Sequence, residues 1–312
     1  MPPRLTVITA TFNGARFLPE TIESVLTQTV SDFDFIIIDD GSSDETPSML
    51  ERYRKQDARI TILTQENRGI PSSLNRAIMA AKTELIAHID ADDRALPDWL
   101  EKQLAFLMLH PENSVVSSYA YLINADGNRI GKSQNSIDVK RGVAEKNPQL
   151  FLDIIHSTVL MRKSKLLEAG GYREGQTYLE DRDLWGRLIT AGQSIQCNPE
   201  MLVEYRVHSA SLTVKKHSQS DIWLGRSINL NIIRRLNGER ELTPEETQAW
   251  FASLPLVERI KESQRFVAGR YFRTAARHYA EKRWLRCAYS LGVATAIRPI
   301  YVLSRVRKKV FG

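Results

Sequence analysis

The sequence predicts an α/β fold in which helices flank a mainly parallel central sheet, followed by a helical region at the C-terminal end. In the first half, short apolar segments alternate with helical patterns of about ten to fifteen residues, which is typical of βαβ units. Two of the early strands end in carboxylates, at positions 39–40 and 90–93. From about His217 onward, glycine and turn signals become rare and helix-forming residues dominate. We therefore expect an α/β domain over residues 1–215 and a helical region over 216–312.

The expected strands are short, β-branched runs that stop at turn or acidic signals. They cover residues 5–9, 35–38, 59–63, 85–89 and 115–123. Helices are expected between them: one with Phe17, Ile22, Val25 and Leu26 on one face, one beginning at Ser43 to Thr46, one over 71–80, and one from Pro97 to about His110. Because ligands gather at the carboxyl ends of parallel strands, both carboxylate groups are expected at a binding edge.

The C-terminal region is expected to be an appendage of packed helices. Residues 266–298 resemble a helical hairpin of the tetratricopeptide kind, and one such unit is not an array. The expected interlocking positions are Tyr271, Ala275, Ala276, Tyr279, Ala280, Trp284, Ala288, Leu291 and Ala294. Residues 282–312 contain eight Lys or Arg residues and no acid, which suits an anionic partner; a solvated basic face is the alternative.

Composition excludes several classes of protein. Hydrophobic residues make up 42% and charged residues 26% of the 312 residues, which is typical of a globular chain. Cys197 and Cys287 are far apart, which argues against a disulfide scaffold or a zinc ribbon. The first residues show no secretory signal pattern, and no apolar run reaches the roughly 18–20 residues that span a bilayer. We therefore expect the protein on the cytoplasmic side.

Asp90, Asp92 and Asp93 form a dense acidic group. Alone, such a group most often caps the following helix. Three carboxylates within four residues repel one another by about a few kcal/mol unless a cation is present. Mg²⁺ and Mn²⁺ prefer oxygen ligands and are commonly held by carboxylates together with substrate phosphates. If the segment is extended, alternation places Asp90 and Asp92 on one side and Asp93 on the other.

The order of motifs along residues 4–213 resembles family-2 glycosyltransferases, which have the GT-A fold, a Rossmann-like arrangement. The matching blocks are VITATFN (7–13), SVLTQT (24–29), FIIIDDGSSD (35–44), ENRG (66–69), LNRA (74–77), IDADD (89–93), HSTVLMR (156–162), GGY (170–172), EDRDLW (180–185) and YRVH (205–208). The resemblance implies an enzyme that uses a nucleotide-sugar donor and a divalent metal.

The resemblance also implies how the donor is bound. Asp40 matches the carboxylate that accepts the uracil N3–H, which favours a UDP-sugar, while its neighbour Asp39 caps the following turn. Arg68 matches a residue near the base and diphosphate. Segment 9–12 matches the lining of the base and ribose, with Thr9, Ala10 and Phe12 as its members. The family often has proline and tyrosine at the last two of these positions, so a hydroxyl contact is lost here.

Further positions match the metal site and the reacting centre. Asp92 and Asp93 match the ribose and metal carboxylates, with Asp90 beside them shaping the turn, and His208 matches a late metal ligand whose alternative role is structural. Arg206 and Lys215 are candidates for neutralising the negative charge of the diphosphate. The resemblance places His156 near the donor sugar or the acceptor; the alternative is a histidine buried in the core.

Asp181 matches the catalytic base of inverting members, which takes a proton from the acceptor hydroxyl. Glu180, also a donor-binding candidate, is its first competitor. Asp183 suits the N-terminal end of a helix instead. Trp185 is expected to pack behind the base, with an aromatic sugar platform as the alternative.

The resemblance therefore implies an inverting, Mn²⁺- or Mg²⁺-assisted transferase that moves a sugar, from UDP by preference, to a glycan or lipid-linked acceptor in cell-surface polysaccharide synthesis. A nucleotidyltransferase is a second hypothesis. Such enzymes generally begin with a glycine-rich loop, whereas residues 9–17 contain a single glycine, Gly14, which argues against this hypothesis. A non-catalytic binding domain is the third. We expect no nucleic-acid partner and a peripheral place at the inner face of the plasma membrane, where basic residues interleave with apolar ones over 298–309.

Overall fold

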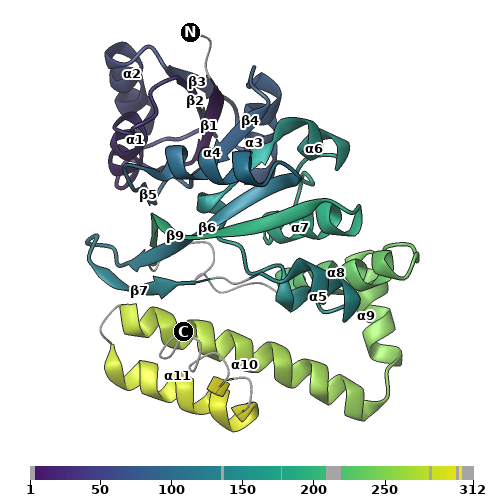
Figure 1. Ribbon diagram of the computed structural model, residues 1–312. Coiled ribbons are helices and arrows are strands. Elements are labelled where there is room, and N and C mark those ends of the chain that lie inside the picture. Colours follow the sequence, from purple (N-terminus) through teal and green to yellow (C-terminus); the bar gives the residue numbers. More distant parts are fainter. Residues whose placement is uncertain are drawn as a thin grey trace. The chain divides into compact units, whose positions relative to one another are not determined.

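The computed structural model describes residues 4–134, 137–176, 178–208, 219–280, 283–299 and 302–303 (Figure 1). The chain divides into two compact units. The first unit contains Met1–Ala120, Asn135–Tyr205 and Ile232–Glu239, and the second contains Tyr121–Gln134, Arg206–Asn231 and Arg240–Gly312. A domain boundary after residue 215 stays a prediction.

The first unit is built on a sheet whose first four strands are parallel. β1 (Leu5–Thr11) pairs with β2 (Phe33–Asp39) on one side and β4 (Leu85–His88) on the other, and β3 (Ile60–Thr64) pairs with β2. The sheet continues through β8 (Leu160–Arg162), β6 (Asn113–Ile123), β9 (Ser194–Arg206) and β5 (Arg94–Ala95). β8 runs antiparallel to both β4 and β6, so β6 again points the same way as β1. The predicted mainly parallel sheet is confirmed.

Helices cover this sheet because its strands are apolar on both faces. On one face, side chains of α1 (Leu18–Leu26), α2 (Thr46–Gln56) and α4 (Trp99–Leu109) form one buried cluster with Val7 and Phe35. The neighbouring strand residues, such as Ile8 and Ile36, point to the opposite face and are also buried. α3 (Ile70–Ala80) packs on β1 and β2. The flanking helices that the sequence predicts are therefore present.

Some boundaries differ from the expected ones for local reasons. α2 begins at Thr46 and not at Ser43, because Asn13 Oδ1 accepts the N–H of Ser43 at 2.8 Å and Asp44 Oδ1 accepts that of Thr46 at 2.9 Å, which holds the intervening residues in a turn. α4 begins two residues after Pro97. The remaining elements of the first unit are α5 (Val139–Ala144), the short helices η1 (Pro148–Leu150) and η2 (His156–Thr158), α6 (Lys163–Glu168) and α7 (Glu180–Thr190).

The second unit is mainly helical. β7 (Arg129–Ser133) pairs with β6, and α8 (Gln219–Leu236) begins in this unit and ends in the first. α9 (Pro244–Ser253) starts with a capping box between Thr243 and Glu246. α10 (Leu256–Ala280) and α11 (Trp284–Ile297) pack along each other, which confirms the predicted helical hairpin (Figure 1). Within the described residues, no helix is both long and apolar enough to cross a bilayer.

The side chains that interlock in this hairpin are only partly those expected. Ala275 and Ala294 are buried as expected. Tyr279, Trp284 and Ala288 are exposed, so their assignment as interlocking positions is wrong. Ala268 and His278 on α10 and Ser290 on α11 are buried as well. The side chains of Ala276 and Ala280 lie outside the described residues.

Candidate functional site

The candidate site lies at the carboxyl edge of the parallel strands. β1 and β2 end in register, with Thr11 paired with Asp39, so the residues that follow them lie at one edge. Asp40 follows β2, and Asp90 follows β4 one residue after Ile89. The strand order therefore brings together the two acidic segments that the sequence singles out.

Asp40 is buried and accepts three hydrogen bonds. Its Oδ1 accepts from Gln65 Nε2 at 2.7 Å and from the N–H of Arg68 at 3.0 Å, and its Oδ2 accepts from the N–H of Gly69 at 2.8 Å. A carboxylate has about four acceptor positions, so one remains for a ligand N–H. Asp39 Oδ1 accepts the N–H of Ser42 at 3.0 Å, so its predicted capping role is confirmed.

The segment that is expected to line the base has one exposed aromatic ring. Phe12 is 51% exposed, so its ring can stack on a planar ligand. Ala10 is half-buried beside it. The hydroxyl of Thr9 is buried and donates to the carbonyl of Ile89 at 2.8 Å, which ties β1 to the start of the acidic turn. The Arg68 guanidinium lies at the surface, 3.3 Å from a carboxylate oxygen of Glu174.

Residues 90–93 form a tight turn and not an extended segment. β4 ends at His88, and the N–H of Asp93 donates to the carbonyl of Asp90 at 3.2 Å. The expectation that Asp90 and Asp92 share one side by strand alternation is therefore wrong. Asp90 and Asp93 converge instead: Ser157 Oγ lies 2.8 Å from Asp90 Oδ2 and also contacts Asp93 Oδ2. Asp92 is half-buried in the turn between them.

Ser157 is the residue on which this turn converges, and the sequence did not single it out. Its buried hydroxyl accepts the N–H of Asp90 at 3.1 Å. The hydroxyl carries one hydrogen, so it can donate to only one of the two carboxylates that it contacts. Burial and the neighbouring Asp92 raise the pKa of Asp90. Asp90 and Asp93 therefore bring two carboxylate groups to one hydroxyl, and hard oxygen donors in this arrangement fit a divalent cation.

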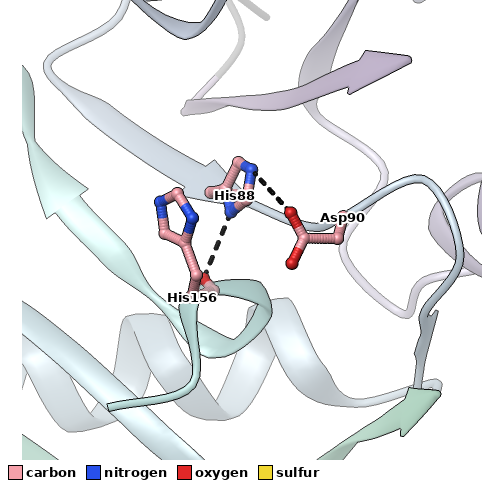
Figure 2. A group of neighbouring side chains, drawn as sticks. All are labelled: His88, Asp90 and His156. Carbon is pink, nitrogen blue, oxygen red and sulfur yellow. Dashed lines mark hydrogen bonds and ion pairs between the residues drawn. The ribbon is translucent and has the colours of Figure 1, made fainter. Parts of the chain in front are cut away.

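Two stacked histidines, His88 and His156, lie next to Asp90 of this turn. The rings of His88 and His156 lie 3.8 Å apart with an angle of 26° between their planes (Figure 2). His88 Nδ1 is 3.2 Å from the carbonyl of His156, so Nδ1 carries the hydrogen and Nε2 faces Asp90 Oδ1 at 3.5 Å. Burial lowers the pKa of both histidines. Because an imidazole holds a metal in its ring plane, the two stacked rings do not share one ion in this arrangement.

A chain of hydrogen bonds holds His156 in place. Its Nε2 lies 2.7 Å from the hydroxyl of Tyr172. Asn75 on α3 accepts the N–H of Tyr172 with Oδ1 and donates to its carbonyl with Nδ2, both at 2.8 Å. Gly171 precedes this tyrosine at φ +65°, and a β-carbon there would lie 2.7 Å from Asn75 Oδ1. The LNRA and GGY motifs are therefore parts of one support for the site.

Glu180 and Asp181 lie at the N-terminus of α7, after Leu179 in the left-handed region at φ 59°. Asp181 Oδ1 accepts the N–H of Arg182 at 2.7 Å. Burial raises the pKa of Asp181 to about 6, and burial and the charge of Asp181 raise that of Glu180 to about 8. The charge of Asp90 adds to both shifts, so these carboxylates and the acidic turn form one electrostatic cluster.

Other candidates have structural roles. Asp183 is buried and its Oδ2 accepts from Arg187 Nε at 2.8 Å, while Arg187 Nη2 donates to the carbonyl of Gly171 at 2.7 Å. Trp185 is fully buried, so it packs in the core as expected and offers no sugar platform. Arg206 is also buried and donates to the carbonyl of Ala125 at 3.1 Å, so its suggested role at the diphosphate is wrong.

The predicted third metal ligand lies in the other unit of the chain. His208 is half-buried and belongs to the second unit, whereas Asp92 and Asp93 belong to the first. Its metal role stays a prediction. Lys215 lies outside the described residues.

Comparison with known proteins adds to this picture. Residues 6–168 match the model of the family described as Glycosyl transferase family 2. The O-antigen biosynthesis glycosyltransferase WbnJ of Escherichia coli is 33% identical over 212 residues, which cover 66% of this chain and 81% of that protein.

Two solved structures share the fold. The crystal structure of S. aureus TarS 1–349 in complex with UDP-GlcNAc superimposes with a TM-score of 0.61 at 15% identity and covers 96% of this chain and 92% of that one. The mannosyltransferase PcManGT of Pyrobaculum calidifontis, in complex with GDP-Man and Mn²⁺, has a TM-score of 0.53 at 16% identity over 99% of this chain and 79% of that one.

Proposed function

The chain belongs to glycosyltransferase family 2 and has its GT-A fold, and we propose that it transfers a sugar with inversion from a UDP-sugar to a saccharide or lipid-linked acceptor. Named relatives act in polysaccharide biosynthesis, which favours a cell-surface polysaccharide as the product. The observation that carries the proposal is the cluster of carboxylates at the carboxyl edge of the sheet, with Asp181 beside the acidic turn.

We assign the nucleotide to the edge between Phe12 and Asp40. Asp40 has one acceptor position left after its three hydrogen bonds, and the N3–H of uracil is a matching donor. Phe12 offers its exposed ring to the base. TarS in complex with UDP-GlcNAc supports UDP, while PcManGT in complex with GDP-Man makes a guanine donor the alternative to test.

Asp92 and Asp93 are the proposed carboxylate ligands of a divalent metal, with His208 as a further ligand. The convergence of the Asp90 and Asp93 carboxylates on Ser157 supports a cation there, as does the Mn²⁺ bound to PcManGT. When bound, such an ion neutralises the charge of the departing diphosphate. Ser157 holds Asp93 through its hydroxyl, so it orients one proposed ligand.

Asp181 is the proposed base, and the charges around it favour it over Glu180. With a pKa of about 6, Asp181 is mainly ionised at pH 7 and yet more basic than an ordinary aspartate. With a pKa of about 8, Glu180 is mainly protonated at that pH and cannot accept a proton. Asp183 is held by Arg187 and is not available for proton transfer.

The function is tested with the purified chain, Mn²⁺ and a panel of UDP- and GDP-sugars. We expect slow release of UDP from one donor and faster release when a suitable acceptor is added. Pyrophosphate release would instead indicate a nucleotidyltransferase, and tight UDP binding without turnover a binding domain.

The base is tested with Asp181→Asn, which we expect to keep UDP binding and lose transfer. Glu180→Gln is the matched variant and should retain transfer at pH 7. If Asp181→Asn retains transfer, Asp181 is not the base.

A further inference from the structure

The outward face of α11 is mainly apolar, with Arg286 exposed beside it. Its exposed residues recur at helical spacing through Leu285, Ala288, Tyr289, Gly292 and Ala296, with Trp284 at one side. Leu285 is 89% exposed, Tyr289 69% and Trp284 59%. A helix on the surface of a globular protein normally turns charged or polar residues outward. α11 instead turns Trp284, Leu285 and Tyr289 outward.

The inward face of the same helix explains why the large residues lie outside. Ser290 and Ala294 are buried, as is Ala275 on the partner helix α10. Small side chains at these positions allow the two helices of the hairpin to approach closely there. Trp284 contacts Tyr279 of α10 edge-on, with ring centroids 5.3 Å apart, whereas the strongly exposed Leu285 and Tyr289 remain for an external contact.

The charge of this part of the chain indicates what covers the face. Residues 263–312 contain twelve Lys or Arg residues and one acid, Glu281, whereas the rest of the chain has 31 basic and 36 acidic residues. Arg283 and Arg286 are exposed at the start of α11, next to Leu285. An apolar face with basic residues beside it matches an anionic lipid surface, where aromatic side chains prefer the boundary between headgroups and acyl chains.

A second copy of the chain fits this face less well. Self-association through α11 would bring two such basic segments together, and their repulsion opposes the contact. A lipid surface with negative headgroups attracts the same charges.

We propose that the outward face of α11 docks on an anionic lipid bilayer. The helix lies along the interface, with Leu285 and Tyr289 inserted below the headgroups and Arg283 and Arg286 at the lipid phosphates. This contact does not depend on the proposed reaction, so its test does not require activity.

The test is co-sedimentation of the full chain with vesicles of phosphatidylcholine alone or with about a third phosphatidylglycerol. We expect binding only to the anionic vesicles and weakening by salt. The double variant Leu285→Ser/Tyr289→Ser should bind at least about tenfold more weakly. The matched control is Met108→Ser/Leu109→Ser, which removes two exposed apolar side chains of α4 (73% and 77% exposed) and should bind like the unchanged protein.

Two outcomes would overturn the proposal. One is equal binding of the unchanged protein and the α11 variant to anionic vesicles, with both shown to be folded by urea unfolding. The other is a self-associated chain in sedimentation velocity that the α11 variant converts to monomer, with no vesicle binding by either protein. Arg283→Gln/Arg286→Gln adds an independent measurement: it should weaken binding to anionic vesicles and reduce the dependence on salt.

Discussion

Replacing Ser157 by alanine removes the hydroxyl on which the acidic turn converges. Two losses follow from its contacts. One carboxylate of the pair Asp90 and Asp93 loses a hydrogen-bond donor, which costs about 1.5–3 kcal/mol, and the N–H of Asp90 loses its acceptor, which costs about 1–3 kcal/mol when buried. No large cavity forms, because alanine keeps the β-carbon. Allowing for relaxation, we expect the free energy of unfolding to fall by about 3 kcal/mol.

Urea unfolding in metal-free buffer measures this change, with the midpoint moving and the slope unchanged. Ser164→Ala is the matched control, since Ser164 Oγ also lies 2.5 Å from a carboxylate oxygen, that of Glu84, but at the surface. It should cost less than about 1 kcal/mol. A loss below about 0.5 kcal/mol for Ser157→Ala would refute the reasoning, because the turn would then be held by other contacts.

Four further predictions rest on the same geometry. For transfer, kcat/KM should fall about tenfold for each pH unit below about 6, where Asp181 takes up its proton; a flat profile there contradicts its role. Because the pKa of Glu180 is raised from 4.5 to about 8, folding is favoured by its protonated form, so thermal stability should fall as pH rises from about 4.5 to 8, and Glu180→Gln should flatten that fall. Asn75→Ala loses both bonds to Tyr172 and should lower the free energy of unfolding by about 2 kcal/mol in urea. Asp40→Asn should weaken UDP binding by about tenfold or more in calorimetry, and unchanged affinity would remove it from the base site.

The strands that the sequence predicts most clearly are those that are buried on both faces of the sheet. β1, β2 and β4 are rich in apolar and β-branched residues and are buried along most of their length, because helices cover both sides of the sheet there. β8 has only three residues, and β9 is interrupted by Pro199 and Glu200, which are both exposed, so neither shows a long apolar run. The pairing of β8 and β9 depends on the strands beside them in the sheet, and the sequence of each strand alone does not predict it.

The sequence predicts the part of the candidate site that lies directly after the parallel strands. Asp40 and the acidic turn lie at the expected edge, since strand ends are readable in the sequence. Ser157 and His88 were missed because their role depends on contacts between distant positions: Ser157 is 67 residues from Asp90. Asn75 and Tyr172 are 97 residues apart, and only the fold shows that their two motifs are bonded.

The buried carboxylates oppose folding, and the fold retains them. Burial and their mutual charge raise the pKa values of Asp90, Glu180 and Asp181, so their ionised forms disfavour the folded state at neutral pH. The hydrogen bonds of Asn75 and Tyr172 fix His156, on which His88 stacks, and they bring no positive charge to these carboxylates. Nearby positive charge offsets these shifts only in part: the charge of Arg182 lowers the pKa of Asp181, which still stays at about 6. Asp183, by contrast, forms an ion pair with Arg187 at 2.8 Å. Buried carboxylates whose pKa values stay raised beside rigid supports are the arrangement expected where a cation and a polar substrate complete the site.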